Sequence, residues 1–421
     1  MIRNRQFNKI LIRLLAAVLA GVLALAATGC GKENAVESAE GTIYMNDAES
    51  AASDGIKIDS ERRDEILQKE MDLSPLEEKI VLPQDSCSYS ESLAEQALLL
   101  CTGHTKEKEA KLLEDNGFTV LLQNNYEKED DDPAHSCAYT FAVKDVEYGG
   151  ETRTLVVAAI RGTNAGEWYS NFDFAESHSD DTEYAENFLF AAEDVMVTLE
   201  STLQQMENPL VLICGHSRGA AAANILGMLE NAVHGTANIF TYTFAAPATH
   251  KGEEYTDCSN IFNIINPCDV VPMVPLKSWG YERYGTDIIL DGDAEEINQL
   301  EEDMESLYEI APTISSYYED RHSLTGAGLS EDGATTFELM MILASTLADS
   351  VSMYGEGEST ASDEETETSF DIDDLLSMTE ESDFAPLFEL LKDMTDDDCC
   401  RGLDILENHM PYRYQELLNS K

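Results

Sequence analysis

The feature that most constrains the fold is a short segment in which an apolar run, a serine between two glycines and a run of alanines follow one another directly. The apolar run covers residues 210–214 and is typical of a strand that is covered on both faces. The sequence Gly-His-Ser-Arg-Gly follows at 215–219, and the alanines begin an expected helix over 220–229. This passage from a buried strand through a glycine turn into a closely packed helix predicts an α/β fold with a mostly parallel sheet.

The same segment contains a candidate nucleophile, Ser217. A serine hydroxyl must project clear of the backbone to attack a substrate, and the turn that achieves this is so sharp that neighbouring side chains would collide. Gly215 and Gly219 remove those collisions. The amide of Arg218 would lie at the helix N-terminus, where it can donate a hydrogen bond to an oxyanion. Gly-x-Ser-x-Gly alone occurs by chance, but its position between this strand and this helix favours catalysis over a purely structural turn.

Strands alternate with helices along the rest of the chain, which is the pattern of an α/β domain. The expected helices cover 91–100, 107–116, 184–206 and 220–229, and the expected strands cover 118–122, 137–146, 152–160, 210–214, 239–245 and 261–265. Acidic or Met-rich helical patterns at 293–308 and 337–353 are expected to cover one end of the sheet or to roof a site.

The N-terminal residues resemble a secretory signal. Basic residues precede an uncharged run at 14–27, which is too short to cross a bilayer as a mature helix. Small residues then lead into Cys30, as in a bacterial lipoprotein signal that is cut before an acylated cysteine. An ordinary signal peptide with an incidental cysteine is the alternative. We predict a lipoprotein signal peptide over 1–29, a flexible acidic tether over 30–72 and one α/β domain over 73–421, with a helical acidic insertion or cover at about 292–400.

The formal net charge of −56 excludes several partners. Nucleic-acid binding needs a basic surface, which this composition does not supply. Electrostatic attachment to anionic lipid is disfavoured for the same reason, so a membrane anchor would have to be a covalent lipid on Cys30. The expected location is the outer face of a bacterial cell membrane, with secretion as the alternative.

Cysteines and histidines give no sign of a metal centre. Nine cysteines are present, so a lipidated Cys30 leaves eight, an even number that permits disulfides without revealing their pairing. No Cys-x-x-Cys pair occurs, and the histidines are too scattered for a zinc site. The acidic runs at 130–132 and 396–398 lack the ordered spacing of a calcium loop, although calcium binding stays open. We expect neither a metal nor a cofactor.

Two further residues are candidates for the site. Thr163 directly follows an apolar strand, where its amide and hydroxyl could provide the second oxyanion donor; a plain turn is the alternative. Asp269 follows the expected strand at 261–265, at the carboxyl edge where sites of open α/β sheets collect. A carboxylate there can orient a histidine and stabilise the imidazolium that forms. The alternative is a solvated loop aspartate.

The choice of histidine follows from chain order. An α/β site of this type uses serine, acid and histidine in that order, and only His322 and His409 follow Asp269. His409 is favoured because it lies on a loop between an expected helix at 403–407 and Pro411, which begins another. The acidic stretch before it is easier to interpret as an insertion than as part of a core. If His409 were instead a surface histidine, His322 would be the base.

The chain resembles the class 3 lipase family over roughly 141–275. The resemblance is carried by Arg161-Gly162-Thr163 followed by Trp168 and Asn171, by Gly215-His216-Ser217-Arg218-Gly219, and by Asn266-Pro267-Cys268-Asp269-Val270-Val271-Pro272. His409-Met410-Pro411-Tyr412 is also similar to a His-x-x-Tyr segment near the C-terminus of that family. One departure is Glu186-Asn187-Phe188, where members often have His-x-Gly-Phe.

The resemblance implies an α/β-hydrolase fold and an esterase that acts on acylglycerols and related lipids. It implies Thr163 as oxyanion residue, Ser217 as nucleophile and Asp269 as acid. The expected reaction is hydrolysis of carboxylic esters through an acyl-serine, on a lipid substrate, beneath a lid formed by 168–174 or 337–347. Two alternatives stay open: a catalytically inactive, surface-anchored binding protein on a hydrolase fold, and a serine peptidase.

Overall fold

The computed structural model describes residues 80–103, 105–126, 137–162, 186–251, 256–273, 281–292 and 407–420, together with single residues between 62 and 71. The chain divides into two compact units, one formed by residues 1–69 and 298–407 and the other by residues 70–297 and 408–421. In the first unit, Arg62 forms an ion pair with Glu407 at 3.6 Å. Every element below belongs to the second unit, called the sheet unit here.

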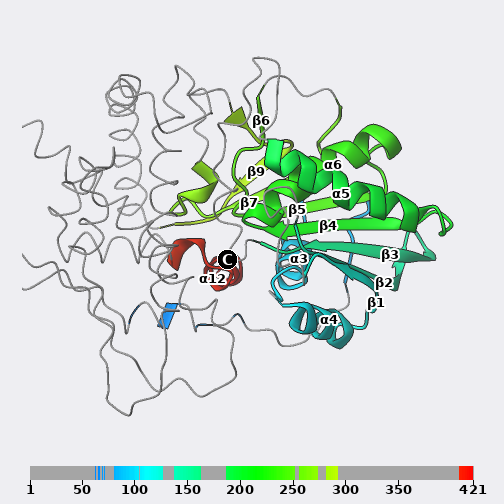
Figure 1. Cartoon of the computed structure of the whole chain (residues 1–421), viewed down its shortest axis with the longest axis horizontal. Helices are drawn as coiled ribbons and strands as arrows, with labels where there is room; N and C mark the ends of the chain where they lie inside the picture. The colour runs from blue at the N-terminus through cyan, green and yellow to red at the C-terminus, as the bar shows by residue number, and fades with distance from the viewer. Residues whose placement is uncertain are drawn as a thin grey trace, which may run out of the picture. The chain divides into compact units, whose positions relative to one another are not determined.

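The sheet unit is built on a seven-stranded sheet with the order β1-β2-β3-β4-β5-β7-β9 (Figure 1). β1, β2 and β3 pair antiparallel, whereas β3, β4, β5, β7 and β9 are all parallel. The strands are β1 Thr119–Asn124, β2 Tyr139–Tyr148, β3 Glu151–Ile160, β4 Leu210–His216, β5 Ile239–Phe244, β7 Ile261–Ile265 and β9 Thr286–Ile289. This mostly parallel sheet, flanked by helices, confirms the predicted α/β-hydrolase architecture.

Helices cover both faces of the sheet (Figure 1). They are α3 Glu91–Leu99, α4 Lys106–Asp115, α5 Glu186–Leu203, α6 Arg218–His234 and α12 Pro411–Asn419. α5 packs on α6, and α6 packs on β4 and β5 from one side. α3 contacts the same two strands from the other side, and α12 packs against α3. The last helix of the chain therefore docks onto one of the first.

Local sequence explains where these elements begin and end. Ser90 and Thr105 are N-caps, and their side chains accept hydrogen bonds from the amides three residues on, at 3.3 Å and 3.2 Å. Gly117 has a φ of +79°, a conformation that glycine adopts without strain, and α4 ends before it as predicted. Pro411 occupies the first turn of α12, where its missing N–H costs nothing.

The central strands are buried as their continuous apolar sequences predict. Every residue of β4 and β7 is buried, as are the last six of β3. Cys214 is fully buried with a free thiol, which agrees with its expected role as an apolar core residue.

The structure also contains strands that the sequence pattern does not reveal. β9 extends the sheet beyond β7, and β6 (His250–Lys251) pairs with β8 (Tyr281–Glu282) in a separate two-stranded sheet. β9 is only four residues long and largely exposed, so it lacks the apolar run that marks the inner strands. Its pairing with β7 is a tertiary effect that local propensity does not encode.

Several predictions lie outside the described residues: the signal peptide and most of the tether, the helical patterns at 293–308 and 337–353, and the acidic insertion. The predicted domain boundaries therefore stay predictions. Within the described part of the chain, no helix combines the length and the apolar character needed to cross a membrane.

Candidate active site

The turn between β4 and α6 holds Ser217 in a strained conformation. Ser217 has a φ of 57° and a ψ of −127°, which non-glycine residues rarely adopt. A Cβ added to Gly215 would overlap the carbonyl of Gly219, and one added to Gly219 would overlap the carbonyl of Ile160. Both glycines are therefore sterically required, as the sequence predicts, and they let α6 start directly against the edge of the sheet.

Three predicted residues meet at this turn. Nε2 of His409 lies 2.9 Å from Oγ of Ser217, and Nδ1 of His409 lies 2.9 Å from Oδ2 of Asp269. Since Asp269 can only accept when ionised, Nδ1 carries the proton, and Nε2 is left to accept from the serine hydroxyl. The structure thus brings Ser217, Asp269 and His409 together in one hydrogen-bonded chain across 192 residues of sequence.

The Asp269 carboxylate is fully buried and receives three hydrogen bonds. The amide of Val271 donates to Oδ1 at 2.9 Å, and the hydroxyl of Tyr414 donates to Oδ2 at 2.8 Å, beside the bond from His409. Burial, followed by the negative charge of Asp269, raises the pKa of Tyr414 well above its usual value. The tyrosine therefore stays a hydroxyl donor, and the buried charge is compensated.

Asn266 connects the loop of the acid to the segment of the histidine. Its side-chain amide donates to the carbonyl of Asn408 at 2.8 Å, and its side-chain oxygen accepts from the amide of Cys268 at 3.0 Å. Its own amide donates to the hydroxyl of Tyr414 at 3.3 Å. One side chain thereby fixes the residue before His409 relative to the loop that carries Asp269.

His216 also contacts the predicted base. Its Nε2 lies 3.0 Å from the carbonyl oxygen of His409, and the two imidazole rings are 5.0 Å apart. The rings of His216 and Tyr414 pack edge to face, with their centroids 5.9 Å apart. His216 therefore packs beside the base and also makes a polar contact with the backbone of His409.

The expected oxyanion hole is described only in part. Arg218 is the first residue of α6, so its amide lies at the helix N-terminus beside Ser217. Gly162 runs close against the turn, since a Cβ added to it would lie 3.6 Å from Cβ of Ser217. Thr163, Trp168, Asn171, His322 and Cys30 lie outside the described residues.

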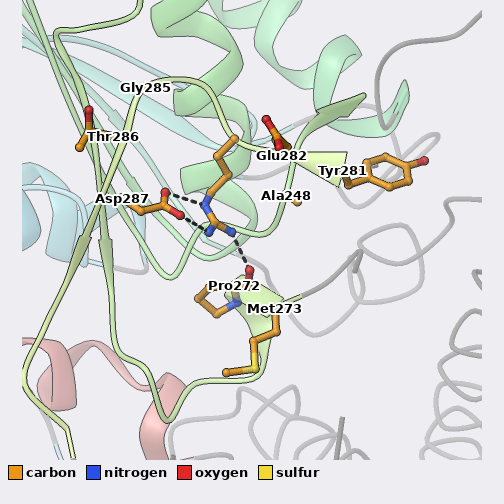
Figure 2. A pocket seen from close by; sticks show the side chains of 9 residues that line it. Ala248, Pro272, Met273, Tyr281, Glu282, Gly285, Thr286 and Asp287 are labelled. Carbon is orange, nitrogen blue, oxygen red and sulfur yellow. Dashed lines mark hydrogen bonds and ion pairs between the residues drawn. The ribbon is translucent and has the colours of Figure 1, made fainter. Parts of the chain in front are cut away.

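A pocket of about 390 Å³ lies beside the loop that follows Asp269 (Figure 2). It is lined by Ala248, Pro272, Met273, Tyr281, Glu282, Arg283, Gly285, Thr286 and Asp287. None of the residues that meet at Ser217 lines it, so we do not assign it to the reacting centre.

Arg283 forms hydrogen bonds that connect the segments around this pocket. Its Nη1 donates to the carbonyls of Pro272 at 2.6 Å and Ala246 at 3.1 Å, and its Nη2 pairs with Asp287 at 2.6 Å. Figure 2 marks the bonds to Pro272 and Asp287 with dashed lines. It therefore links the loop after β5, the loop after Asp269 and β9. Arg283, Asn266 and Tyr414 were not predicted from the sequence as supporting residues. Asn266 belongs to the motif around Asp269, but that motif does not reveal its contacts with Asn408 and Tyr414, and no local motif marks Arg283 or Tyr414.

Comparison with known protein families gives a match over part of the chain. Residues 157–279 match the family model of class 3 lipases, a stretch that includes Ser217 and Asp269 and is less than a third of the chain. This match supports a relationship to the class 3 lipase family and an ester-hydrolase activity. No curated protein sequence matches the chain.

Several solved lipase structures are similar at low identity. The lipase of Rhizopus microsporus var. chinensis is 17% identical, with 53% of this chain and 84% of that chain covered at a TM-score of 0.36. A Rhizomucor miehei lipase–propeptide complex is 15% identical, with 53% and 76% covered and a TM-score of 0.38. A triacylglycerol lipase described as having a serine protease triad as its catalytic centre is 18% identical, with 50% and 78% covered and a TM-score of 0.34.

The strain at Ser217 predicts an unusual stability order between two variants. Ser217→Gly and Ser217→Ala both remove the hydroxyl, but only glycine accepts a φ of 57° without strain. Glycine relieves the backbone strain of the folded state, but its greater conformational freedom also stabilises the unfolded chain. The strain relief is the larger effect, so Ser217→Gly should be more stable than Ser217→Ala by about 1 kcal/mol. Urea unfolding of both variants measures the difference. Equal stability, or a more stable alanine variant, would show that the turn is not strained.

Proposed function

We propose that the protein hydrolyses carboxylic esters with Ser217 as nucleophile, His409 as general base and Asp269 as the acid that orients the histidine. The observation that carries the proposal is the continuous chain of hydrogen bonds from Ser217 Oγ through His409 to the buried carboxylate of Asp269. It lies at the carboxyl edge of a parallel sheet, where such sites collect. The match to class 3 lipases over 157–279 supports the same chemistry.

We assign each step of the proposed reaction to a named group. His409 Nε2 takes the proton of Ser217 as Oγ attacks the ester carbonyl, and the imidazolium is stabilised by Asp269. The amides of Arg218 and Thr163 hold the oxyanion of the tetrahedral intermediate. His409 then gives its proton to the leaving alcohol, and an acyl-serine remains. A water molecule, deprotonated by His409, attacks the acyl group and releases the carboxylic acid.

We propose a lipid ester, an acylglycerol or a phospholipid, as the substrate class. The support is the match to class 3 lipases and the lipase names of the similar structures. Anchoring to the outer face of a membrane through a lipid on Cys30 is a separate proposal, supported by the sequence of basic, apolar and small residues that precedes that cysteine.

The reaction mechanism predicts which residues are indispensable. A fluorophosphonate probe should label the wild type, and Ser217→Ala should not be labelled. His409→Ala should lose roughly a thousandfold or more in the rate of hydrolysis of a short soluble ester, because Nε2 of His409, 2.9 Å from Oγ of Ser217, is the group that takes the serine proton. His322→Ala, the matched control, should keep the rate of the wild type.

Three outcomes would contradict the assignment. If His322→Ala abolishes turnover and His409→Ala does not, the assignment of His409 as the general base is wrong. The assignments of Ser217 as nucleophile and Asp269 as acid would be unaffected. If the folded wild type is neither labelled nor active on esters, the protein is a binding protein on a hydrolase fold. Cleavage of peptides in place of esters would assign it to the peptidases.

Tyr414 is expected to position the acid. Tyr414→Phe removes one of the three hydrogen bonds to Asp269, so kcat should fall about tenfold while KM changes little. Tyr242→Phe is the control, because its hydroxyl accepts a hydrogen bond from the amide of Ser90, away from Ser217. Both variants should lose about 1 kcal/mol of stability, but only Tyr414→Phe should be slow. Equal rates of hydrolysis in the two variants would show that Tyr414 does not position Asp269 for catalysis.

The anchor proposal is tested by fractionation of cells that express the full chain. Cys30→Ala should move the protein out of the alkali-washed membrane fraction, because the lipid on the Cys30 thiol is the proposed anchor. Retention of the variant in the washed membranes would mean that something other than a lipid on Cys30 holds the protein.

A further inference from the structure

Three side chains with metal-binding groups converge where α5 and α6 end. Glu200 lies in the last turn of α5, whereas Glu230 and His234 lie four residues apart at the end of α6 and so share one face of that helix. One ligand atom from each lies within 4.8 Å of the other two. The sequence gives no hint of this cluster, because Glu200 is thirty residues from Glu230 and only the packing of α5 on α6 joins them.

Glu230 is the unusual member of the group. Its side chain is fully buried, and neither carboxylate oxygen accepts a hydrogen bond within the part of the chain that the structure describes. Burial, together with the neighbouring Glu200, raises the pKa of Glu230 to about 8. A buried carboxylate without donors is costly, and it must be compensated by a proton or by a cation.

The three groups are oriented toward a common point. Nε2 of His234 lies 2.5 Å from Oε1 of Glu200 and 3.7 Å from Oε2 of Glu230, so one ring nitrogen faces both carboxylates. A proton on that nitrogen can satisfy Glu200 but leaves Glu230 without a partner. A metal ion with bonds of about 2.0–2.2 Å to nitrogen and oxygen would serve all three after small side-chain movements.

The surroundings also favour a positive ion. α5 and α6 both end here, and the C-terminal end of a helix carries the negative end of its dipole. The net charge of the chain is strongly negative, which raises the local concentration of cations.

We propose that Glu200, Glu230 and His234 bind one divalent transition-metal ion, of which Zn²⁺ is the best fit. An imidazole nitrogen with two carboxylates suits zinc better than calcium or magnesium, which prefer oxygen ligands alone. Water would fill the fourth position. Ser217 lies at the opposite end of α6, roughly 25 Å away along the helix at 1.5 Å per residue. At that distance the ion would take no part in ester hydrolysis, and its role would be to hold α5 against α6.

The test uses the full chain after treatment with a chelator. Isothermal titration with ZnCl₂ should show one saturable site, and Zn²⁺ should raise the melting temperature. Glu230→Gln and His234→Ala should each weaken binding at least about tenfold and abolish the thermal shift. Glu193→Gln, which removes an exposed carboxylate from the same helix as Glu200, is the matched control and should bind like the wild type. Titration with CaCl₂ measures non-specific binding to the acidic surface.

The outcomes are distinct. The side chain of His234 is 43% exposed, so His234→Ala should fold normally and decides the question if Glu230→Gln does not fold. If the wild type shows no saturable Zn²⁺ site, or if His234→Ala binds Zn²⁺ as tightly as the wild type, the proposal is wrong and Glu200 and Glu230 share a proton. Ester hydrolysis should be the same in His234→Ala as in the wild type, which separates this test from that of Ser217.

Discussion

The arrangement of the site depends on a single buried charge, the carboxylate of Asp269. It has no exposure to solvent, so it must be compensated by donors inside the protein. Those donors are the amide of Val271, the hydroxyl of Tyr414 and Nδ1 of His409. Two of the three come from the last segment of the chain. Docking of that segment therefore compensates the charge and, by the same contacts, delivers the imidazole to Ser217.

The fold and the nucleophile could be predicted from the sequence more readily than the rest of the site, because the rest depends on contacts between distant segments of the chain. The β4–Ser217–α6 turn follows from a contiguous pattern of apolar residues, glycines and alanines, because the packing it needs is local. Asp269 could be proposed from its place after a strand, and His409 from the order of the chain. The contacts of Tyr414 with Asp269, and of Asn266 with Asn408 and Tyr414, span more than 140 residues, so no spacing in the sequence marks them. β9 was not predicted for the same reason, because it forms a strand only through its pairing with β7.

The two ends of α6 illustrate how one helix can serve two separate tasks. Its N-terminus meets Ser217, where the positive end of the dipole and the amide of Arg218 suit a developing negative charge. Its C-terminus meets Glu200 and carries Glu230 and His234, where the negative end suits a cation. The helix interior is almost entirely buried against β4 and β5, so the two ends are held rigidly in relation to the sheet.

The central claim is that Ser217 forms a covalent acyl intermediate, and trapping that intermediate tests it most directly. The wild type would be mixed rapidly with a chromogenic short-chain ester, quenched in acid within the first turnover, digested and mapped by mass spectrometry. The account predicts a burst of released alcohol and an added acyl mass on the peptide that contains Ser217. Turnover of the ester without any acylated peptide, or with the acyl group on a different residue, would contradict it.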